Sequence, residues 1–174
     1  YYKPIRIGER IVIVPAWEKY DKQPNDIIVT MDPGMAFGTG THETTRLVIG
    51  LLEKYAGEGQ RMLDVGCGSG ILAICASKLG ARECKAYDID EVAVRVAADN
   101  ILSNDCENVT CEQSDLLKNV DLEGGKYDLI TANIVADIII RMIPDVGNYM
   151  KDDAVLLASG IIGARADDVI HAFE

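Results

Sequence analysis

The sequence predicts an α/β fold built on a doubly wound, mostly parallel sheet with helices on both faces. From residue 61 onward, short apolar runs of strand length alternate with longer amphipathic runs of helix length. The connections between these runs are short, and the apolar runs have the continuous hydrophobic character of strands buried on both faces. Strict alternation of this kind favours a parallel sheet with right-handed crossovers.

The predicted elements of this region follow one another in regular order. Its strands are apolar runs at 61–65, 84–88, 108–111, 127–132 and 153–159. Its helices carry apolar residues at helical spacing and span 70–79, 91–104 and 135–149, with a last one starting near 163. Asp90 is the predicted cap of the second helix, whose face is formed by Ala93, Val96, Ala97 and Ile101. Ligands of such sheets bind beyond the carboxyl ends of the strands.

Two strands and one helix are predicted before this alternation begins. The apolar run 10–15 and the short run 26–30 are the strand candidates. A segment unusually rich in small residues, 32–42, is predicted to be a loop. A helix should follow, with Thr41 or His42 near its cap and one face formed by Leu47, Leu51 and Leu52.

The length of 174 residues fits one domain with a single sizeable core. We therefore expect residues 1–174 to form a single catalytic domain. Its parts are lead-in strands, a glycine-rich loop with its helix, and a Rossmann-like core, at 1–31, 32–60 and 61–174.

The composition is acidic, with 28 Asp and Glu against 17 Lys and Arg and a net charge of −11. Phosphate binding depends on clustered Lys and Arg, so no direct nucleic-acid binding is expected. The charge suits a cationic partner, although solubility alone explains it equally well. No apolar stretch approaches the roughly 20 residues that span a bilayer. The first residues also lack an apolar signal core, so we expect no membrane association and a cytoplasmic location.

The five cysteines form no CxxC pair, and the chain has only two histidines, so no metal site is expected. An odd number of cysteines without a secretory signal indicates reduced thiols in the cytosol. Cys67 lies inside a glycine loop, but no histidine is near it in sequence. We interpret Cys67 as a small loop residue and not as a nucleophile.

The strongest functional motif is the segment 62–72, in which an apolar strand with Asp64 near its end leads through Gly66, Gly68 and Gly70 into a helix. Glycines allow the turn and leave room for a ligand against the backbone, and the helix N-terminus offers N–H groups to an anion. A dinucleotide fingerprint requires GxGxxG, but Ile71 stands where its third glycine would be. The GxGxG form after an acid is the one used by S-adenosylmethionine enzymes. A purely structural turn remains the alternative.

Two acidic residues follow the next two strands. Asp88 ends the strand 84–88, where a carboxylate can accept hydrogen bonds from both hydroxyls of a ribose. Asp115 follows the strand 108–111 and could accept a hydrogen bond from the exocyclic amine of adenine. Ordinary solvated or capping acids are the alternative for both residues.

Asn133 follows the fourth strand, at the place where a transferred methyl group would lie. Its side-chain carbonyl can accept a hydrogen bond from an amine and orient the nitrogen lone pair. The alternative is that Asn133 caps the helix beginning near 135, and the two roles are compatible. Asn133 is therefore the catalytic candidate, with an orienting role and without a general base.

Three segments together resemble the ribosomal protein L11 methyltransferase (PrmA) family. They are the run from Asp32 to Thr45 that contains PGMAFGTGTH, the run from Asp64 to Leu72, and Ala132-Asn133-Ile134. The resemblance covers essentially the whole chain, and the first run is the most specific part of it. It implies a Rossmann-like class I S-adenosylmethionine-dependent methyltransferase fold.

The resemblance also implies a reaction and its site. Methyl groups would pass from S-adenosyl-L-methionine to lysine and N-terminal amines of the large-subunit ribosomal protein L11. Thr45, Gly66, Asp88 and Asn133 would contact the cofactor, together with Asp64, Gly68 and Asp115 from the motifs above. The glycine-rich run would close over the methionine end of the cofactor, and His42 is interpreted as a structural residue. Family members carry a substrate-recognition domain before the catalytic domain and a strand pair after it, so the chain is interpreted as a fragment without them.

Three other functions fit parts of the sequence. A methyltransferase acting on a nucleic-acid base or a glutamine amide usually shows Asn-Pro-Pro-Tyr where this chain has Asn133-Ile134-Val135-Ala136. A non-catalytic Rossmann-fold interaction module is disfavoured by the intact acids at 64 and 88. A nicotinamide dehydrogenase is disfavoured by the position of the third glycine.

Overall fold

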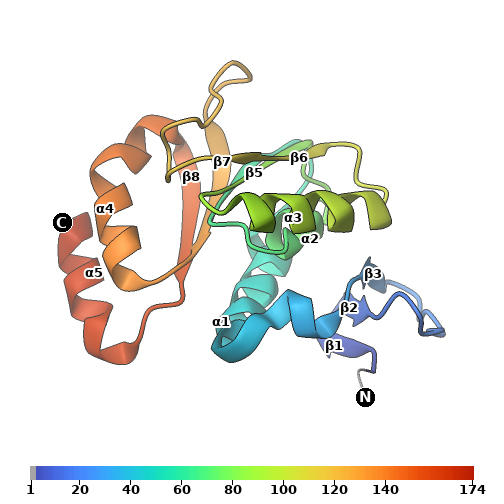
Figure 1. Ribbon diagram of the computed structural model, residues 1–174. Coiled ribbons are helices and arrows are strands. Elements are labelled where there is room, and N and C mark those ends of the chain that lie inside the picture. Colours follow the sequence, from blue (N-terminus) through green and yellow to red (C-terminus); the bar gives the residue numbers. More distant parts are fainter. Residues whose placement is uncertain (1–2) are drawn as a thin grey trace.

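The computed structural model describes residues 3–174, excluding the side chains of residues 33–42, and contains a five-stranded parallel sheet with helices on both faces (Figure 1). The strand order is β6-β5-β4-β7-β8, and every neighbouring pair is parallel. The strands are β4 (Arg61–Val65), β5 (Glu83–Asp88), β6 (Val109–Gln113), β7 (Tyr127–Asn133) and β8 (Met150–Ser159). The predicted α/β class and doubly wound parallel sheet are confirmed.

The helices cover the sheet from two sides and create two apolar layers. One layer contains α2 (Ile71–Lys78), and the other contains α4 (Ala136–Val146) and α5 (Ala166–Phe173). Side chains of β4 alternate between them, with Met62 in the first layer and Leu63 in the second. This alternation explains why the strand is apolar at nearly every position.

The predicted elements of the core are confirmed, with small shifts at their ends. Helix α3 (Glu91–Ser103) is capped as predicted, because Val92 N–H donates to Asp90 Oδ1 at 2.9 Å. The helix predicted at 135–149 ends at Val146 and continues as the 3₁₀ turn Gly147–Tyr149. The last helix is preceded by the 3₁₀ turn Gly163–Arg165.

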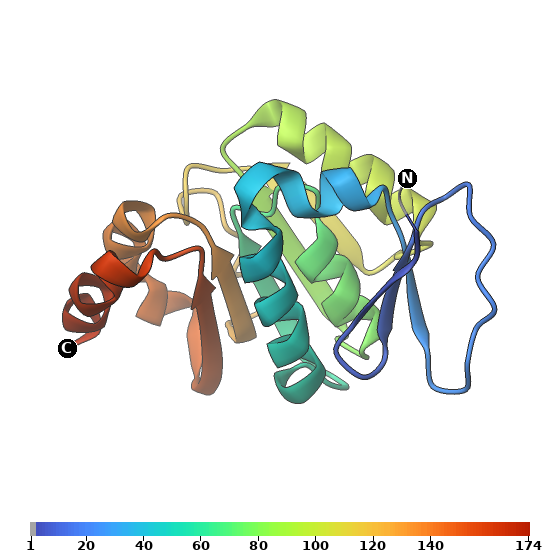
Figure 2. The ribbon, with the colours of Figure 1, turned by 90° about the horizontal axis from the view of Figure 1, so that it is seen from below.

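The predicted loop at 32–42 is wrong, because helix α1 (Pro33–Tyr55) begins at Pro33. Several glycines, which have low helix propensity, favoured the loop prediction. Proline is well suited to the first helical position, since its fixed φ is helical and its missing N–H would have no partner there. The ribbon changes direction within the first part of this helix (Figure 2). Neither Thr41 nor His42 therefore lies at a helix start, and their side chains are outside the described residues.

The predicted core face of α1 is also wrong in part. Leu47 and Leu51 are 67% and 41% exposed, whereas Leu52 is buried as expected. The buried stripe consists of Thr45, Val48, Ile49 and Leu52, which have the i, i+3, i+4, i+7 spacing of one helix face. Choosing the leucines placed the face about one third of a turn away from the true one.

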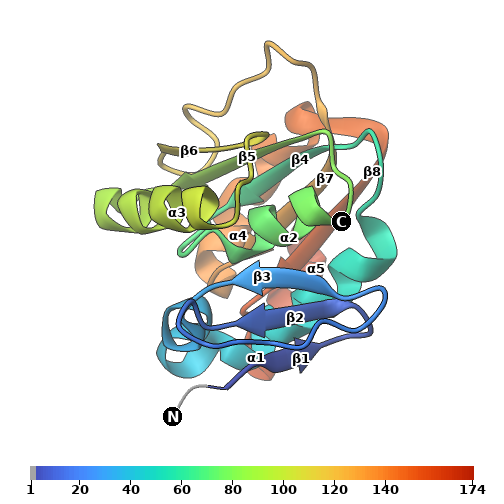
Figure 3. The same ribbon diagram turned by 90° about the vertical axis from the view of Figure 1, so that its right-hand side faces the viewer.

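A small three-stranded sheet packs beside the core (Figure 3). It consists of β1 (Ile5–Ile7), β2 (Ile11–Val14) and β3 (Ile27–Thr30), and only β1 was not predicted. Asn104, at the end of α3, connects this sheet to the core. Its Oδ1 accepts from Thr30 N–H at 2.7 Å, and its Nδ2 donates to Thr30 O at 2.8 Å. The amide thus forms hydrogen bonds with the backbone N–H and C=O groups of Thr30 at the edge of β3, as a neighbouring strand would.

Glu53 on α1 holds the turn between β1 and β2, and its loss is expected to weaken this connection. Its carboxylate accepts hydrogen bonds from the backbone N–H groups of Glu9, Arg10 and Ile11 at 2.8–2.9 Å. Burial opposes the charge, but these bonds outweigh it and lower the pKa of Glu53. We expect Glu53→Gln to reduce the free energy of unfolding at pH 7 by about 2 kcal/mol, measured by urea denaturation.

The pH dependence provides a second measurement of the same interaction. Because the folded-state pKa of Glu53 is depressed, its stabilisation is present above its ordinary pKa and is lost as the pH falls through the depressed value. The difference between wild type and Glu53→Gln should therefore shrink in acid. Glu58→Gln, at an exposed position, is the matched control. An equal loss in both variants would contradict the role of Glu53.

Candidate functional site

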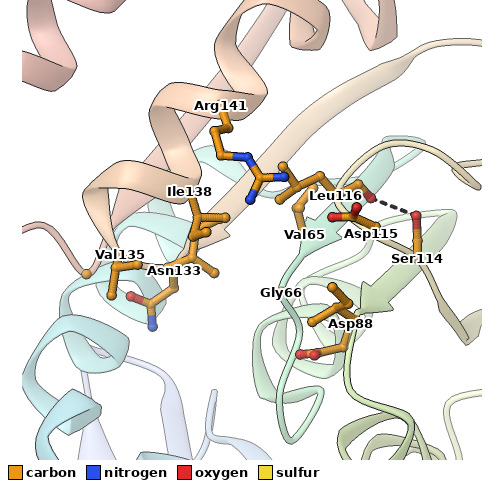
Figure 4. Close-up of a pocket in the computed structure, with 13 residues that line it drawn as sticks. Val65, Gly66, Asp88, Ser114, Asp115, Leu116, Asn133, Val135, Ile138 and Arg141 are labelled. Atoms are coloured by element: carbon orange, nitrogen blue, oxygen red, sulfur yellow. Dashed lines mark hydrogen bonds between the residues drawn. The ribbon is translucent and has the colours of Figure 1, made fainter.

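A cavity of about 420 Å³ lies beyond the carboxyl ends of the central strands (Figure 4). Its size is in the range of small-molecule sites. In Figure 4, Gly66 and Asp88 lie on one side of the cavity, and Asn133, Val135 and Ile138 lie on the other. The full lining consists of Val65, Gly66, Asp88, Ile89, Ser114, Asp115, Leu116, Asn133, Ile134, Val135, Ile138, Arg141 and Gly160.

The glycine loop forms the wall of the cavity nearest to β4. Gly66 has φ +73, and a Cβ there would overlap the side chain of Ile134. Its N–H and that of Cys67 both donate to Tyr87 O, at 2.8 and 2.9 Å. The loop is therefore held against β5, and glycine at 66 is required both by its backbone angle and by the space available.

Asp88 connects the loop to the end of β5. Its Oδ2 accepts from Gly68 N–H and its Oδ1 accepts from Asp90 N–H, both at 2.9 Å. A carboxylate has about four lone-pair sites, so two acceptor positions remain beside the cavity. The Gly68 N–H, in contrast, is already used by Asp88. The carboxylate is thus oriented before any ligand binds.

The turn after β6 forms the opposite end of the cavity. Asp115 forms an ion pair with Lys118 at 2.8 Å, and this contact lowers the pKa of the carboxyl. Leu116 has φ +53, an uncommon angle for a branched side chain, and its carbonyl accepts from the Ser114 hydroxyl at 2.8 Å. Arg141 extends from α4 toward this turn (Figure 4). Its positive charge also lowers the pKa of Asp115.

Asn133, at the end of β7, is oriented by Thr45 from α1. Its Nδ2 donates to Thr45 Oγ1 at 3.0 Å. Its Oδ1 is buried and has no hydrogen-bond partner among the side chains that the structure describes. The capping alternative is wrong, because α4 has Val135 at its N-cap and no side-chain cap. An unsatisfied buried carbonyl beside a cavity is unfavourable unless a ligand donates to it.

Asp64 lies below the glycine loop and does not line the cavity. It is buried, and its Oδ1 accepts from the Thr131 hydroxyl at 2.7 Å. Its Oδ2 is without a partner among the described residues. Burial raises the pKa of Asp64 to about 7, the Thr131 hydrogen bond opposes this shift, and the negative charge of Asp88 adds to it.

We expect Asp64→Asn to stabilise the protein above neutral pH. Because the folded-state pKa of Asp64 is raised, wild-type stability is lost as the pH rises from about 4 to about 7. Asparagine keeps the acceptor for Thr131 and removes the buried charge. The stability advantage of the variant should therefore increase between pH 5 and pH 8 by about 2–4 kcal/mol, measured by urea unfolding. A constant difference across this range would contradict the assignment.

The structure brings four of the sequence-predicted residues to one cavity: Gly66, Asp88, Asp115 and Asn133. Thr45 touches the site through Asn133. Asp64 and Gly68 lie outside the cavity lining: Gly68 donates to Asp88 from the glycine loop, and Asp64 accepts from Thr131 on β7. Sequence reasoning missed several lining residues. Gly160 could have been found, because it follows β8 and β8 ends at the same sheet edge. The other missed residues include Leu116, Val135, Ile138 and Arg141.

The described residues show no feature of a metal or thiol site. They contain no cluster of three or more His, Cys, Asp or Glu residues that could hold a metal ion. All five cysteines are free. Burial raises the pKa of the Cys67 thiol well above its usual range, which disfavours the reactive thiolate. Within the described part of the chain, no helix is long and apolar enough to cross a membrane.

Comparison with known protein sequences identifies one family. The sequence model of "Ribosomal protein L11 methyltransferase (PrmA)" matches residues 1–174. A protein of that name from Caldanaerobacter subterraneus subsp. tengcongensis is 53% identical over the whole chain, which covers 55% of that relative. A relative of the same name from Thermoanaerobacter pseudethanolicus is 51% identical, and the chain covers 56% of it. The chain thus spans about half the length of the curated relatives it matches.

Comparison with solved structures agrees with the sequence comparison. The crystal structure of a ribosomal protein L11 methylase from Lactobacillus delbrueckii subsp. bulgaricus has a TM-score of 0.88 and 35% identity, with coverage of 99% of this chain and 86% of that one. A precorrin-6y C5,15-methyltransferase from Geobacter metallireducens has a TM-score of 0.63 at 16% identity, covering 73% of this chain and 69% of that one. This second likeness shows the fold alone.

Proposed function

Because the chain belongs to the ribosomal protein L11 methyltransferase (PrmA) family, we propose that it transfers methyl groups from S-adenosyl-L-methionine to amines of a large-subunit ribosomal protein, L11. Lysine side chains and the N-terminal amine are the acceptors proposed from the family resemblance. The observation that carries the proposal is the unsatisfied Asn133 Oδ1 beside a cavity of suitable size. A cytoplasmic location and the absence of direct nucleic-acid binding accompany the proposal.

The residues present fit this cofactor. Asp88 offers two remaining acceptor positions for the hydroxyls of a ribose, and Asp115 lies where an adenine amine could donate. Gly66 lets the cofactor approach the backbone of the loop, and the Gly68 N–H orients Asp88. Asp64, buried beneath the cavity lining, is proposed to bind the cofactor only indirectly, by joining β4 to β7 through Thr131. The carboxylates around the cavity also favour a positively charged sulfonium.

Asn133 is proposed to orient the acceptor amine, with Thr45 holding its amide in place. The Thr45 hydroxyl accepts from Nδ2, which leaves Oδ1 available to accept from the amine N–H. When bound, S-adenosylmethionine would supply an activated methyl group to the amine nitrogen, with the electron pair of the broken S–C bond left on sulfur and the amine proton passing to water. Positioning and desolvation supply most of the acceleration in such a displacement.

No general base is proposed, although the acceptor amine must be neutral when it attacks. A free lysine has a pKa of about 10.4, and removal from water at the cavity lowers it. His42 remains a predicted structural residue, and its side chain lies outside the described residues. We expect His42→Ala to retain methyl transfer.

The experiment that tests the proposal uses the variant Asn133→Ala. We expect its methyl transfer to fall about a hundredfold, because the acceptor nitrogen is no longer positioned. The assay follows label from S-adenosylmethionine into purified ribosomal protein L11. Asn148→Ala, which alters an exposed amide in the 3₁₀ turn Gly147–Tyr149 away from the cofactor cavity lining, is the matched control. Unchanged transfer in Asn133→Ala would contradict the orienting role.

The same assay separates the competing functions. Whole ribosomes supply both RNA and protein, and label found only in RNA would replace the proposal with nucleic-acid methylation. Binding of S-adenosylmethionine without transfer either to ribosomal protein or to a lysine peptide, which needs no recognition domain, would indicate a non-catalytic module. A response to a nicotinamide dinucleotide in place of S-adenosylmethionine would identify a dehydrogenase.

A further inference from the structure

A second, smaller cavity of about 120 Å³ adjoins the cofactor cavity at the end of β7. The two cavities share Val135 and Gly160. The other residues that line the smaller one are Ala136, Asp137, Ile162 and Arg165. Because Asn133 lies only two residues before Val135, the smaller cavity adjoins the end of the cofactor cavity that contains the Asn133 amide.

The wall between the two cavities is held in a fixed geometry. Ile134 N–H donates to Ser159 O at 3.1 Å and joins the ends of β7 and β8. Gly160 follows with φ +82, and a Cβ there would lie 2.8 Å from Ile134 O. Glycine is therefore required where the two strand ends meet, and the opening between Val135 and Ile162 is built on rigid backbone.

Two large apolar side chains flank this opening although they are exposed to solvent. Val135 is 61% exposed and Ile162 is 68% exposed. A single exposed apolar residue needs no explanation, but these two line the same cavity next to a reactive site. Their position suits an apolar ligand group that passes between them toward Asn133.

The rim of the smaller cavity carries one excess negative charge: Asp137 and Arg165 line the cavity as a pair, and Asp168, next to Arg165 but outside the lining, adds a second carboxylate. Asp137 Oδ1 pairs with Arg165 at 2.6 Å, and Asp168 Oδ2 pairs with the same guanidinium at 2.7 Å. Two carboxylates therefore share one cation, and the side chain of Asp137 remains 73% exposed. Together with the net charge of −11, this rim attracts a cationic partner.

We propose that the smaller cavity receives the aliphatic stem of an acceptor lysine presented by a cationic protein segment, and we call its opening between Val135 and Ile162 the lysine groove. This inference rests on the proposed function and names the path of its substrate. Lysine combines an apolar stem with a charged end, which matches apolar walls below an acidic rim. The groove directs the amine nitrogen from the rim toward Asn133 Oδ1.

The test is a titration of the full chain in the presence of S-adenosylhomocysteine. Binding is monitored by the nuclear magnetic resonance signals of the Val and Ile methyl groups. The probe is a capped lysine peptide, and the same peptide with norleucine in place of lysine is the control for charge. We expect saturable shifts at Val135 and Ile162 with the lysine peptide and weaker binding of the norleucine peptide. Val135→Ser and Ile162→Ser should each raise the Kd about tenfold. Leu102→Ser, at a site on α3 that is 75% exposed, should leave it unchanged.

The outcomes distinguish the groove from the proposed function. Shifts confined to other methyl groups, or equal Kd values for wild type and the two groove variants, would overturn the proposal that lysine binds in the groove. Lysine binding at Val135 and Ile162 without any methyl transfer to the ribosomal protein would support the groove and contradict the proposed function. Transfer with a KM that Val135→Ser and Ile162→Ser leave unchanged would contradict the groove alone.

Discussion

Replacement of Asp88 by asparagine is expected to weaken the binding of S-adenosylmethionine about a hundredfold or more. Both carboxylate oxygens accept backbone N–H groups, from Gly68 and Asp90, and Asp88 lines the cavity at the end where a ribose is proposed. An amide must turn an NH₂ group toward one of these N–H groups, which disturbs the loop and removes an acceptor from the ligand. Isothermal titration calorimetry of wild type and variant measures the effect.

Asp105→Asn is the matched control for Asp88→Asn. Asp105 is exposed, and asparagine tolerates its φ of +55. This variant should bind the cofactor as wild type does. Thermal unfolding of both unliganded variants shows whether the fold is retained. Cofactor binding that survives in folded Asp88→Asn would contradict the proposed ribose contact.

Replacement of Arg61 by alanine is expected to cost about 3 kcal/mol of stability without a direct effect on the site. Arg61 opens β4 at the sheet edge opposite to the cavity, and its side chain is fully buried. Its guanidinium pairs with Glu83 at 2.8 Å, lies over the Tyr127 ring at 4.2 Å, and donates to Gly125 O. Alanine leaves a cavity and removes the donors for these groups.

Chemical denaturation with urea measures this loss, and Arg82→Ala is its control. Arg82 is exposed, so its removal should change the free energy of unfolding by no more than about 0.5 kcal/mol. Below the unfolding transition, Arg61→Ala should bind S-adenosylmethionine with wild-type affinity. A stability equal to that of wild type would show that the buried guanidinium makes no net contribution.

The parallel sheet could be predicted from the sequence because runs of strand length alternate with runs of helix length, and the central strands β4 and β7 are buried along almost their whole length. β1 could not be predicted in this way, since it is only three residues long and has Arg6 at its centre. The buried face of α1 was misjudged because leucines were preferred over Thr45 and Val48, and only packing decides which stripe faces the core. Arg61 carries no local signal of burial, because its partners come from distant parts of the chain.

The residues of the candidate site that lie at the carboxyl ends of strands could be predicted from the sequence. Asp88 ends a predicted strand, Asp115 and Asn133 each follow one, and parallel strands bring their carboxyl ends to one edge. The hydrogen bond between Asn133 and Thr45 joins residues 88 positions apart and cannot be read from either segment. The unusual backbone angle of Leu116 and the reach of Arg141 from α4 likewise depend on tertiary structure.

A crystal structure of this chain grown with S-adenosylhomocysteine tests the central claim most directly. We predict that the ligand occupies the cavity between the glycine loop and the end of β7, with its ribose hydroxyls on Asp88 and its sulfur facing Asn133. A ligand bound at another surface, while Asp88 and Asn133 keep the contacts they have in its absence, would contradict this account.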